Sequence, residues 1–127
     1  MKTLLVLLGL SFFTAGTLNK NTEDDVIAAL QAANSGKVVD YMDAMIDLKL
    51  PDNVNEITNI KKAQAGIKLG NFFEENGITG FELASKRKMG ELLSITGKLV
   101  GKTQNYNLTI MLKEKAGKSS IITLRIS

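Results

Sequence analysis

Residues 91–127 read ELLSITGKLVGKTQNYNLTIMLKEKAGKSSIITLRIS, and this stretch decides the fold. Apolar and polar residues alternate in three short segments within it, and glycine-bearing turns separate the segments. Because side chains alternate between the two faces of a strand, each segment is predicted to be a strand with one apolar face. The expected inward-facing positions are Leu93, Ile95, Leu99, Tyr106, Leu108, Ile110, Leu112, Ile122, Leu124 and Ile126. A meander of this kind is stable only when another layer covers its apolar face.

The helical patterns that could supply this layer all precede the meander. Thr22 and three following acidic residues are typical of a helix start, and Gly36 is placed to end that helix. A shorter helix is predicted over residues 37–43, and the longest one from about 60 to 76. The expected apolar stripe of the long helix is Ala63, Gly66, Ile67, Gly70 and Phe73, widened by Leu69 and Phe72.

Further strands are predicted over residues 46–50, 54–58 and 80–87, with Pro51 ending the first of them. Helices early in the chain and a strand meander late indicate a single α+β domain. Gly66 and Gly70 inside the long helix predict a close approach of the helix backbone to a curved sheet. A ligand lying across the two glycines is the alternative explanation.

The first residues have the layout of a secretory signal peptide. Lys2 precedes an apolar run over residues 4–13, and small residues follow the run. We therefore expect a signal peptide over residues 1–16, a mature domain over 17–127, and export to the periplasm or the medium. A membrane anchor and a buried N-terminal helix are the alternatives, although the run is shorter than the ~20 residues of a spanning helix.

The sequence contains neither cysteine nor histidine. Zinc, copper, haem and iron–sulfur sites therefore lack their usual ligands, and nucleophilic systems that need histidine are excluded. We expect no metal and no cofactor.

Charge is unevenly distributed, because acidic residues dominate residues 19–52 and basic residues dominate 78–127. Lys86, Arg87 and Lys88 form a compact cluster at a predicted strand end. The cluster lacks the interleaved aromatic residues of nucleic-acid sites, so no nucleic-acid partner is expected. A solvated turn is the favoured interpretation, and contact with anionic lipid or polysaccharide is the alternative.

Six short motifs together carry a resemblance to a known family. They are AALQ (28–31), NSG (34–36), DLKLP (47–51), KAQA (62–65), NFF (71–73) and TLRI (123–126). In this order they resemble the nuclear transport factor 2-like superfamily, and more closely a group of small secreted bacterial proteins described only as a domain of unknown function. The resemblance implies a cystatin/nuclear transport factor 2-like roll, in which N-terminal helices and a long helix pack on a bent antiparallel sheet. It also implies frequent dimers and a pocket at the mouth of the cone, and it supplies no catalytic residue.

The expected interior of the cone is an aliphatic wall without a general base. We therefore expect a non-catalytic binding or interaction module whose apolar pocket suits a hydrophobic small molecule or a partner's side chain. Its predicted lining is Tyr41, Met45, Phe72, Phe73 and Tyr106. Two alternatives stay open: an isomerase- or cyclase-type enzyme using Tyr41 and Asp47, and a purely structural dimer whose cone is filled.

The second face of the meander carries few charges for a solvated surface. Its expected members are Leu92, Ser94, Thr96, Val100, Asn107, Thr109, Met111, Ile121 and Thr123. Because a two-fold interface uses one patch on both subunits, this face predicts a homodimer. The alternative is a solvent-exposed sheet face with scattered apolar residues and no partner.

Overall fold

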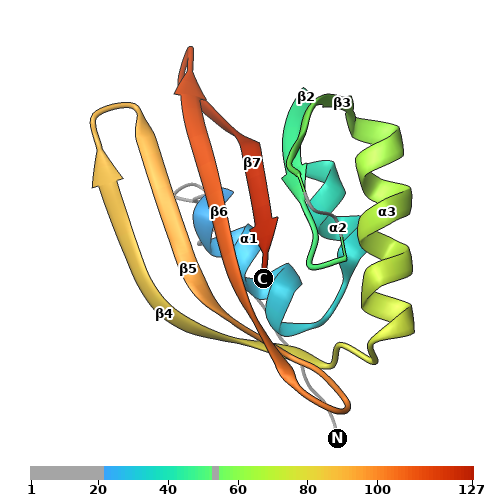
Figure 1. Ribbon diagram of the computed structural model, residues 1–127. Coiled ribbons are helices and arrows are strands. Elements are labelled where there is room, and N and C mark those ends of the chain that lie inside the picture. The colour runs from blue at the N-terminus through green and yellow to red at the C-terminus, as the bar shows by residue number, and fades with distance from the viewer. Residues whose placement is uncertain (1–21, 53–54) are drawn as a thin grey trace, which may run out of the picture.

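The computed structural model describes residues 22–52 and 55–127, which form helices packed on one curved sheet (Figure 1). In chain order the elements are α1 (Thr22–Gln31), α2 (Ser35–Asp40), β2 (Met42–Lys49), β3 (Ile57–Lys61), α3 (Lys62–Glu75), β4 (Gly80–Met89), β5 (Leu92–Val100), β6 (Asn105–Lys115) and β7 (Lys118–Ile126). The six strands lie in the order β3-β2-β7-β6-β5-β4.

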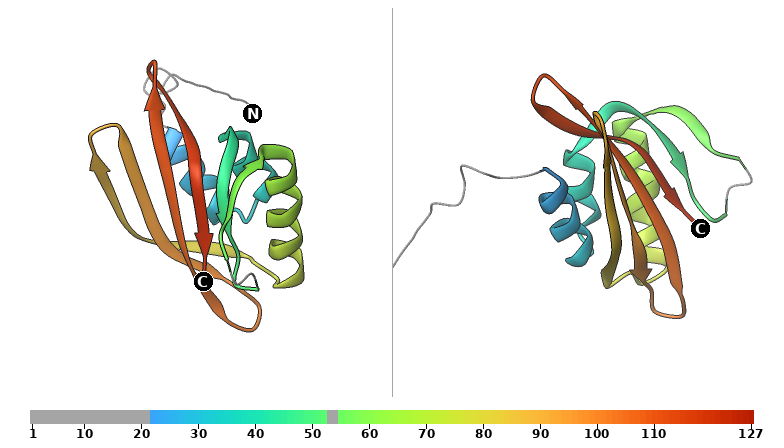
Figure 2. Two further views of the ribbon diagram at one scale, coloured as in Figure 1. Left: turned by 45° about the horizontal axis from the view of Figure 1, so that its top comes forward. Right: turned by 90° about the vertical axis from the view of Figure 1, so that its left-hand side faces the viewer.

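The helices cover one side of this sheet in two places. Helix α1 packs on β4 and β7, helix α3 packs on β2 and β3, and α2 lies between the two helices. Figure 2 shows α1 and α2 on one side of the long strands and α3 beside the β2–β3 hairpin. The predicted α+β roll is confirmed. The sheet is not entirely antiparallel, however, because β2 and β7 run parallel.

The meander of β5, β6 and β7 forms as predicted, with continuous antiparallel pairing between β5 and β6. Aliphatic side chains from its inner face make the centre of the core. Those exposed by 2% or less are Ile95, Leu99, Leu108, Ile110, Leu112, Ile121, Leu124 and Ile126. Helix α1 adds Val26, Ile27 and Leu30 to the same cluster.

The prediction for the start of β7 was wrong. Ile121, and not Ile122, pairs with Leu112 on the inner face, while Thr123 pairs with Met111. The register shifts at this point, so Ile122 is the extra residue of a β-bulge. A bulge changes which side chains face inward, and strict alternation counted from Leu124 therefore places Ile122 on the wrong face.

Helix α3 also differs from its predicted stripe. It begins at Lys62 because residues 57–61 belong to β3, and its buried residues are Ala65, Leu69, Phe72 and Phe73. Ala63 is exposed and the Ile67 side chain is 64% exposed, although both were predicted to face the core. Leu69, Phe72 and Phe73 were therefore predicted correctly, whereas the first part of the stripe was placed on the wrong face of the helix.

The two glycines of α3 allow another helix, and not the sheet, to approach. A Cβ atom added at Gly66 would lie 3.1 Å from Cγ2 of Val39 in α2. The equivalent atom at Gly70 would lie 3.6 Å from the Ser35 hydroxyl oxygen. Close packing was therefore the correct explanation, but its predicted partner was wrong. The short helix α2 fills the space beside α3.

Candidate functional site

The five residues predicted to line one pocket are distributed over the molecule. Phe72 and Tyr106 share a hollow at the C-terminal end of α3. Tyr41 faces a hollow between α1 and α2, and Met45 lies in a third hollow. Phe73 is a core residue with 6% of its surface exposed. The structure brings together only the first pair.

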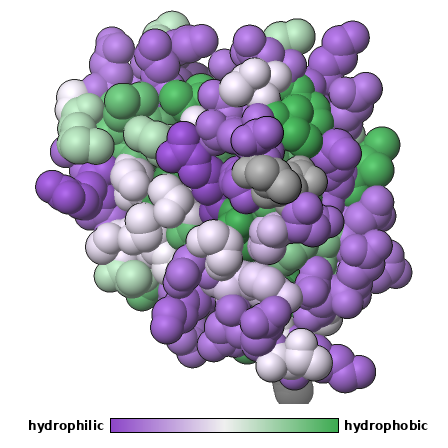
Figure 3. Space-filling view, in the orientation of Figure 1, coloured by the Kyte–Doolittle hydropathy of each residue, from purple (hydrophilic) through white to green (hydrophobic). Residues whose placement is uncertain are grey.

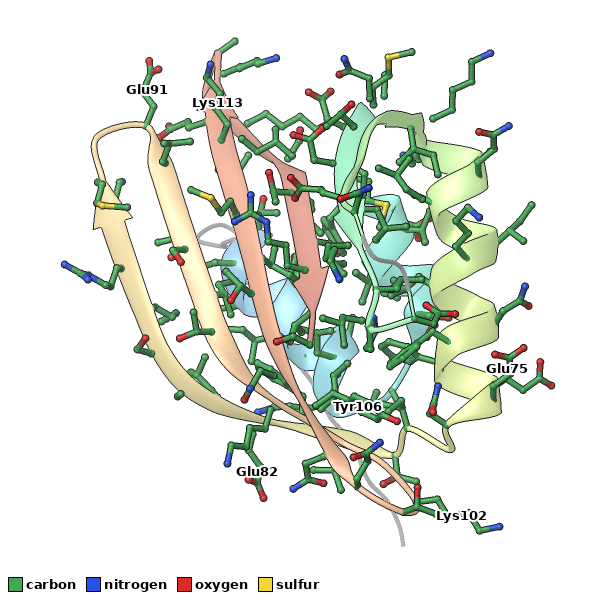
Figure 4. All side chains as sticks on the ribbon, in the orientation of Figure 1. Glu75, Glu82, Glu91, Lys102, Tyr106 and Lys113 are labelled. Atoms are coloured by element: carbon green, nitrogen blue, oxygen red, sulfur yellow. The ribbon has the colours of Figure 1, made fainter. Side chains whose placement is uncertain are left out.

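The hollow at Phe72 and Tyr106 has a volume of about 340 Å³ and walls of mixed polar and apolar character. Its other lining residues are Pro51, Asp52, Glu75, Asn76 and Gln104. The Tyr106 hydroxyl donates to Oδ1 of Asn76 at 2.8 Å and accepts from Nε2 of Gln104 at 3.0 Å. The Tyr106 ring packs edge-on against Phe72, with 5.0 Å between ring centroids. Figure 4 shows Tyr106 between the end of α3 and the β5–β6 turn that carries Lys102. The tyrosine therefore ties the helix end to the sheet.

We expect Tyr106→Phe to lower the free energy of unfolding by about 1 kcal/mol, because the ring stays and its two hydrogen bonds are lost. Urea denaturation followed by circular dichroism measures this change. The effect should overlap with that of Asn76→Ala, so the double variant should be less destabilised than the sum of the single variants. Full additivity would contradict the role assigned to this hydrogen bond.

The residues of the alternative catalytic pair, Tyr41 and Asp47, lie apart. Five strand residues separate them, a span of roughly 15–20 Å along β2. Burial raises the pKa of the Tyr41 phenol, and the neighbouring carboxylates of Asp25 and Asp40 raise it further. Asp47 instead accepts a hydrogen bond from the backbone amide of Asn59 at 3.0 Å. Each residue is thus engaged with a different neighbour.

The interior of the cone is filled by aliphatic side chains. Among the described residues, Thr123 is the only buried polar or charged side chain, and no carboxylate is buried. The same residues contain no cluster of acidic side chains suited to a metal ion. A membrane-crossing helix would need a longer apolar stretch than any helix in residues 22–52 and 55–127 provides.

The hollow at Met45 is more apolar than the hollows at Tyr41 and at Phe72, and it has a volume of about 530 Å³. It forms where the end of α2, the strands β2 and β3, and the start of α3 meet. Its walls are Val39, Ala44, Met45 and Ala63, and Lys61 and Lys62 complete its lining. Met45 pairs with Lys61 across the two strands, and its side chain is 47% exposed. Hydrophobic surface appears over β2, β3 and upper α3 in Figure 3.

The charged side chains near this hollow differ in whether they have an ion-pair partner. Asp43 accepts a hydrogen bond from the backbone amide of Ala44 at 2.9 Å, and this bond lowers the pKa of the Asp43 carboxyl. Lys115, 3.5 Å away, and Lys62 lower that pKa further. Lys61 forms no ion pair with a described residue and stays available at the rim.

Sequence reasoning selected Met45 but missed its neighbours. Val39 belongs to α2, Ala44 to β2 and Ala63 to α3, so three separate elements build one surface. The register of β2 with β3 and the packing of α2 on α3 create this juxtaposition. No local spacing in the sequence signals it.

Comparison with known proteins places this architecture in a family. Residues 23–127 match a family described as a domain of unknown function, DUF4783. The chain belongs to the DUF4783 family. A crystal structure of a DUF4783 protein from Bacteroides ovatus superposes with a TM-score of 0.72 and 24% identity, covering 80% of this chain and 90% of that one. No curated protein matches the chain.

Two more distant structures show that the DUF4783 fold is nuclear transport factor 2-like. A nuclear transport factor 2-like protein of unknown function from Cytophaga hutchinsonii has a TM-score of 0.57 and 10% identity, covering 83% of this chain and 84% of that one. A candidate polyketide cyclase from Sinorhizobium meliloti has a TM-score of 0.62 and 11% identity, covering 90% and 100%. The predicted resemblance is confirmed, and at these identities the similarity concerns the fold alone.

Proposed function

We propose that this DUF4783 protein is an exported, non-catalytic binding module that holds the apolar part of a ligand in the hollow around Met45. The observation that carries the proposal is the hollow itself, which places a half-exposed methionine among small apolar side chains. Its volume of about 530 Å³ lies within the ~300–1,000 Å³ range of small-molecule sites. A site of mainly apolar walls with a few polar groups binds hydrophobic compounds and orients them through those groups.

The proposed ligand is an apolar compound that carries a hydrogen-bond acceptor or an anionic group. The Lys61 ammonium lies at the rim without an ion-pair partner among the described residues. It would orient the polar end of the ligand, while Val39, Met45 and Ala63 would exclude water from the apolar end. This arrangement needs no catalytic group.

Export rests on the N-terminal sequence alone. The predicted signal peptide over residues 1–16 lies outside the described residues, and the family match begins at residue 23. Mass spectrometry of the protein isolated from its host tests the proposal. We expect a chain that begins near residue 17, and a chain that keeps residues 1–16 would contradict it.

Binding is tested by titrating the protein with the uncharged fluorescent dye N-phenylnaphthylamine. Met45→Asp should weaken binding by more than about tenfold, because a ligand would have to desolvate the new carboxylate. Met89→Asp is the matched control, since the two methionines are 47% and 50% exposed. Equal affinities of the two variants, or no dye binding by the wild type, would overturn the proposed site.

The enzymatic alternative receives no such support. A cyclase- or isomerase-type reaction needs a carboxylate and a phenol within reach of the same substrate. Tyr41 lies beside Asp25, whereas Asp47 is held by the backbone of β3. The fold similarity to a candidate polyketide cyclase does not supply this arrangement, and we do not propose it.

We further propose that the protein forms a homodimer through the outer face of β5 and β6. Ser94, Thr96, Thr109 and Met111 lie on this face and are half-buried, and the Ser85 hydroxyl hydrogen-bonds that of Thr96 at 2.7 Å. Figure 3 shows neutral surface over these strands. Ile121, which was predicted on this face, is instead fully buried on the other side.

Sedimentation velocity at high protein concentration tests the dimer. We expect the wild type to sediment as a dimer and Thr96→Arg as a monomer, because each subunit would bring an unpaired charge to the two-fold interface. Thr103→Arg, in the exposed β5–β6 turn, is the control and should stay dimeric. A monomeric wild type ends this proposal, whereas a dimer without dye binding would favour the purely structural alternative.

A further inference from the structure

Strand β4 leaves a long backbone edge uncovered. It is the last strand of the sheet, it spans Gly80–Met89, and every residue from Glu82 onward is exposed. Its residues make no backbone hydrogen bond to any described element other than β5. In Figure 1 and the left view of Figure 2, β4 forms the free border of the molecule. An edge strand presents a row of unpaired amide and carbonyl groups.

The opposite edge of the sheet is much less accessible. Strand β3 has only five residues, Ile57–Lys61, and continues directly into α3, which packs against it. Helix α1 also contacts β4, but it lies on the inner face of that strand. The backbone edge of β4 therefore stays open while its inner face is covered.

Three consecutive basic side chains mark the open part of this edge. Lys86 and Lys88 pair with Ile95 and Leu93 and so point to the inner face, whereas Arg87 pairs with Ser94 and points to the outer face. Lys86 forms an ion pair with Asp24 of α1, at 3.5 Å. Arg87 and Lys88 form no ion pair with a described residue. The predicted turn at Lys88 was wrong, because the cluster belongs to the strand.

We propose that the β4 edge is a docking site for an extended acidic segment of a partner protein, which adds a strand to the sheet. Backbone hydrogen bonds to the edge supply affinity in this mode of recognition, and the side chains supply selectivity. The cationic cluster attracts an acidic segment and repels a basic one. A second copy of this chain would bring the same three cations and matches the edge less well.

The faces to which the β4 side chains point determine which residues the added segment needs. Neighbouring residues of an added strand point to opposite faces, as do Arg87 and Lys88. Two adjacent acidic residues would therefore meet Arg87 on the outer face and Lys88 on the inner face. β-Branched residues around the acidic pair favour the extended conformation that pairing requires.

The probe is a synthetic peptide of about eight residues, with a central pair of glutamates flanked by valine and threonine. Binding to the full-length protein is followed by amide shifts in two-dimensional NMR. We expect the largest shifts at Lys86, Arg87, Lys88 and Met89, and weak or no binding when lysines replace the glutamates. Methylation of alternate peptide amides should abolish binding, since it removes the donors that face β4.

Protein variants test the charge contribution separately. Arg87→Glu should weaken peptide binding by about tenfold or more, because it replaces attraction by repulsion at the contact. Lys118→Glu makes the same charge change at the exposed first residue of β7 and should alter binding less than about twofold. The circular dichroism of both variants should match that of the wild type.

Three results would overturn the proposal. Equal binding of the glutamate and lysine peptides would remove the charge complementarity. Binding that survives amide methylation would remove strand addition. Tight, salt-sensitive binding to phosphatidylglycerol vesicles without peptide binding would identify the cluster as a membrane-surface contact instead.

Discussion

Gly97→Ala is expected to lower the free energy of unfolding by at least about 3 kcal/mol, a large part of the roughly 5–15 kcal/mol that stabilises an ordinary domain. Gly97 lies in β5 opposite Leu83, immediately before a β-bulge at Ala84 of β4. A Cβ atom at this position would overlap the carbonyl oxygen of Glu82 and lie 2.7 Å from Cε1 of Phe81. The overlap with the carbonyl oxygen cannot be relieved by rotating a side chain, because the oxygen belongs to the backbone.

The matched control for this change is Gly80→Ala. Gly80 is also a strand glycine, and an added Cβ atom would meet only the Gln31 carbonyl oxygen, at an ordinary 3.8 Å. We expect a change within about 0.5 kcal/mol. Urea denaturation of the two variants gives the comparison. Similar stabilities would mean that the sheet does not depend on the close approach of β4 to β5 at its bend.

Ile121→Ala is expected to cost about 2–5 kcal/mol, the range for truncating a buried isoleucine. Ile121 is fully buried and pairs with Leu112 across the sheet, next to Met42 of β2. Removing its side chain beyond Cβ would leave a cavity where β2, β6 and β7 meet. Thermal and urea denaturation both measure the loss.

The neighbouring variant Ile122→Ala decides between two registers of β7. Ile122 is partly exposed at the bulge, so its truncation should cost about 1 kcal/mol or less. Strict alternation counted from Leu124 predicts the opposite ranking, with the larger loss at Ile122. If Ile122→Ala proves the more damaging variant, the bulge in β7 is wrongly placed.

Sequence patterns predicted well the elements that carry a clean period. The alternation in residues 105–112 places Leu108, Ile110 and Leu112 in the core, because a period of two admits only one buried face. Sequence patterns failed where a β-bulge or an unexpected packing partner changed which residues are buried. The α3 stripe was shifted because Gly66 was counted as facing the sheet, although it faces Val39 of α2. Gly97, a glycine in an apolar strand position, was a recognisable sign of close backbone approach that the prediction did not use.

The candidate site shows the same division. Met45, Phe72 and Tyr106 were predicted to line one apolar pocket, and each lines a hollow, although Met45 lies in a different one. That the hollows are separate follows from the direction of β2, which carries Met45 toward the start of α3, whereas Phe72 lies near its end. Lys61 and Val39 had no local signal, since nothing in their spacing relates them to Met45.

By itself, the sequence determined the class of the fold, the apolar face of the meander and the absence of histidine and cysteine chemistry. These properties depend on local periodicity and on residue type. Only the tertiary structure decided the parallel pairing of β2 with β7, the bulges in β4 and β7, the approach of α2 to α3 and the hollow that results. These features depend on contacts between residues far apart in the chain, which the pattern of either segment does not encode.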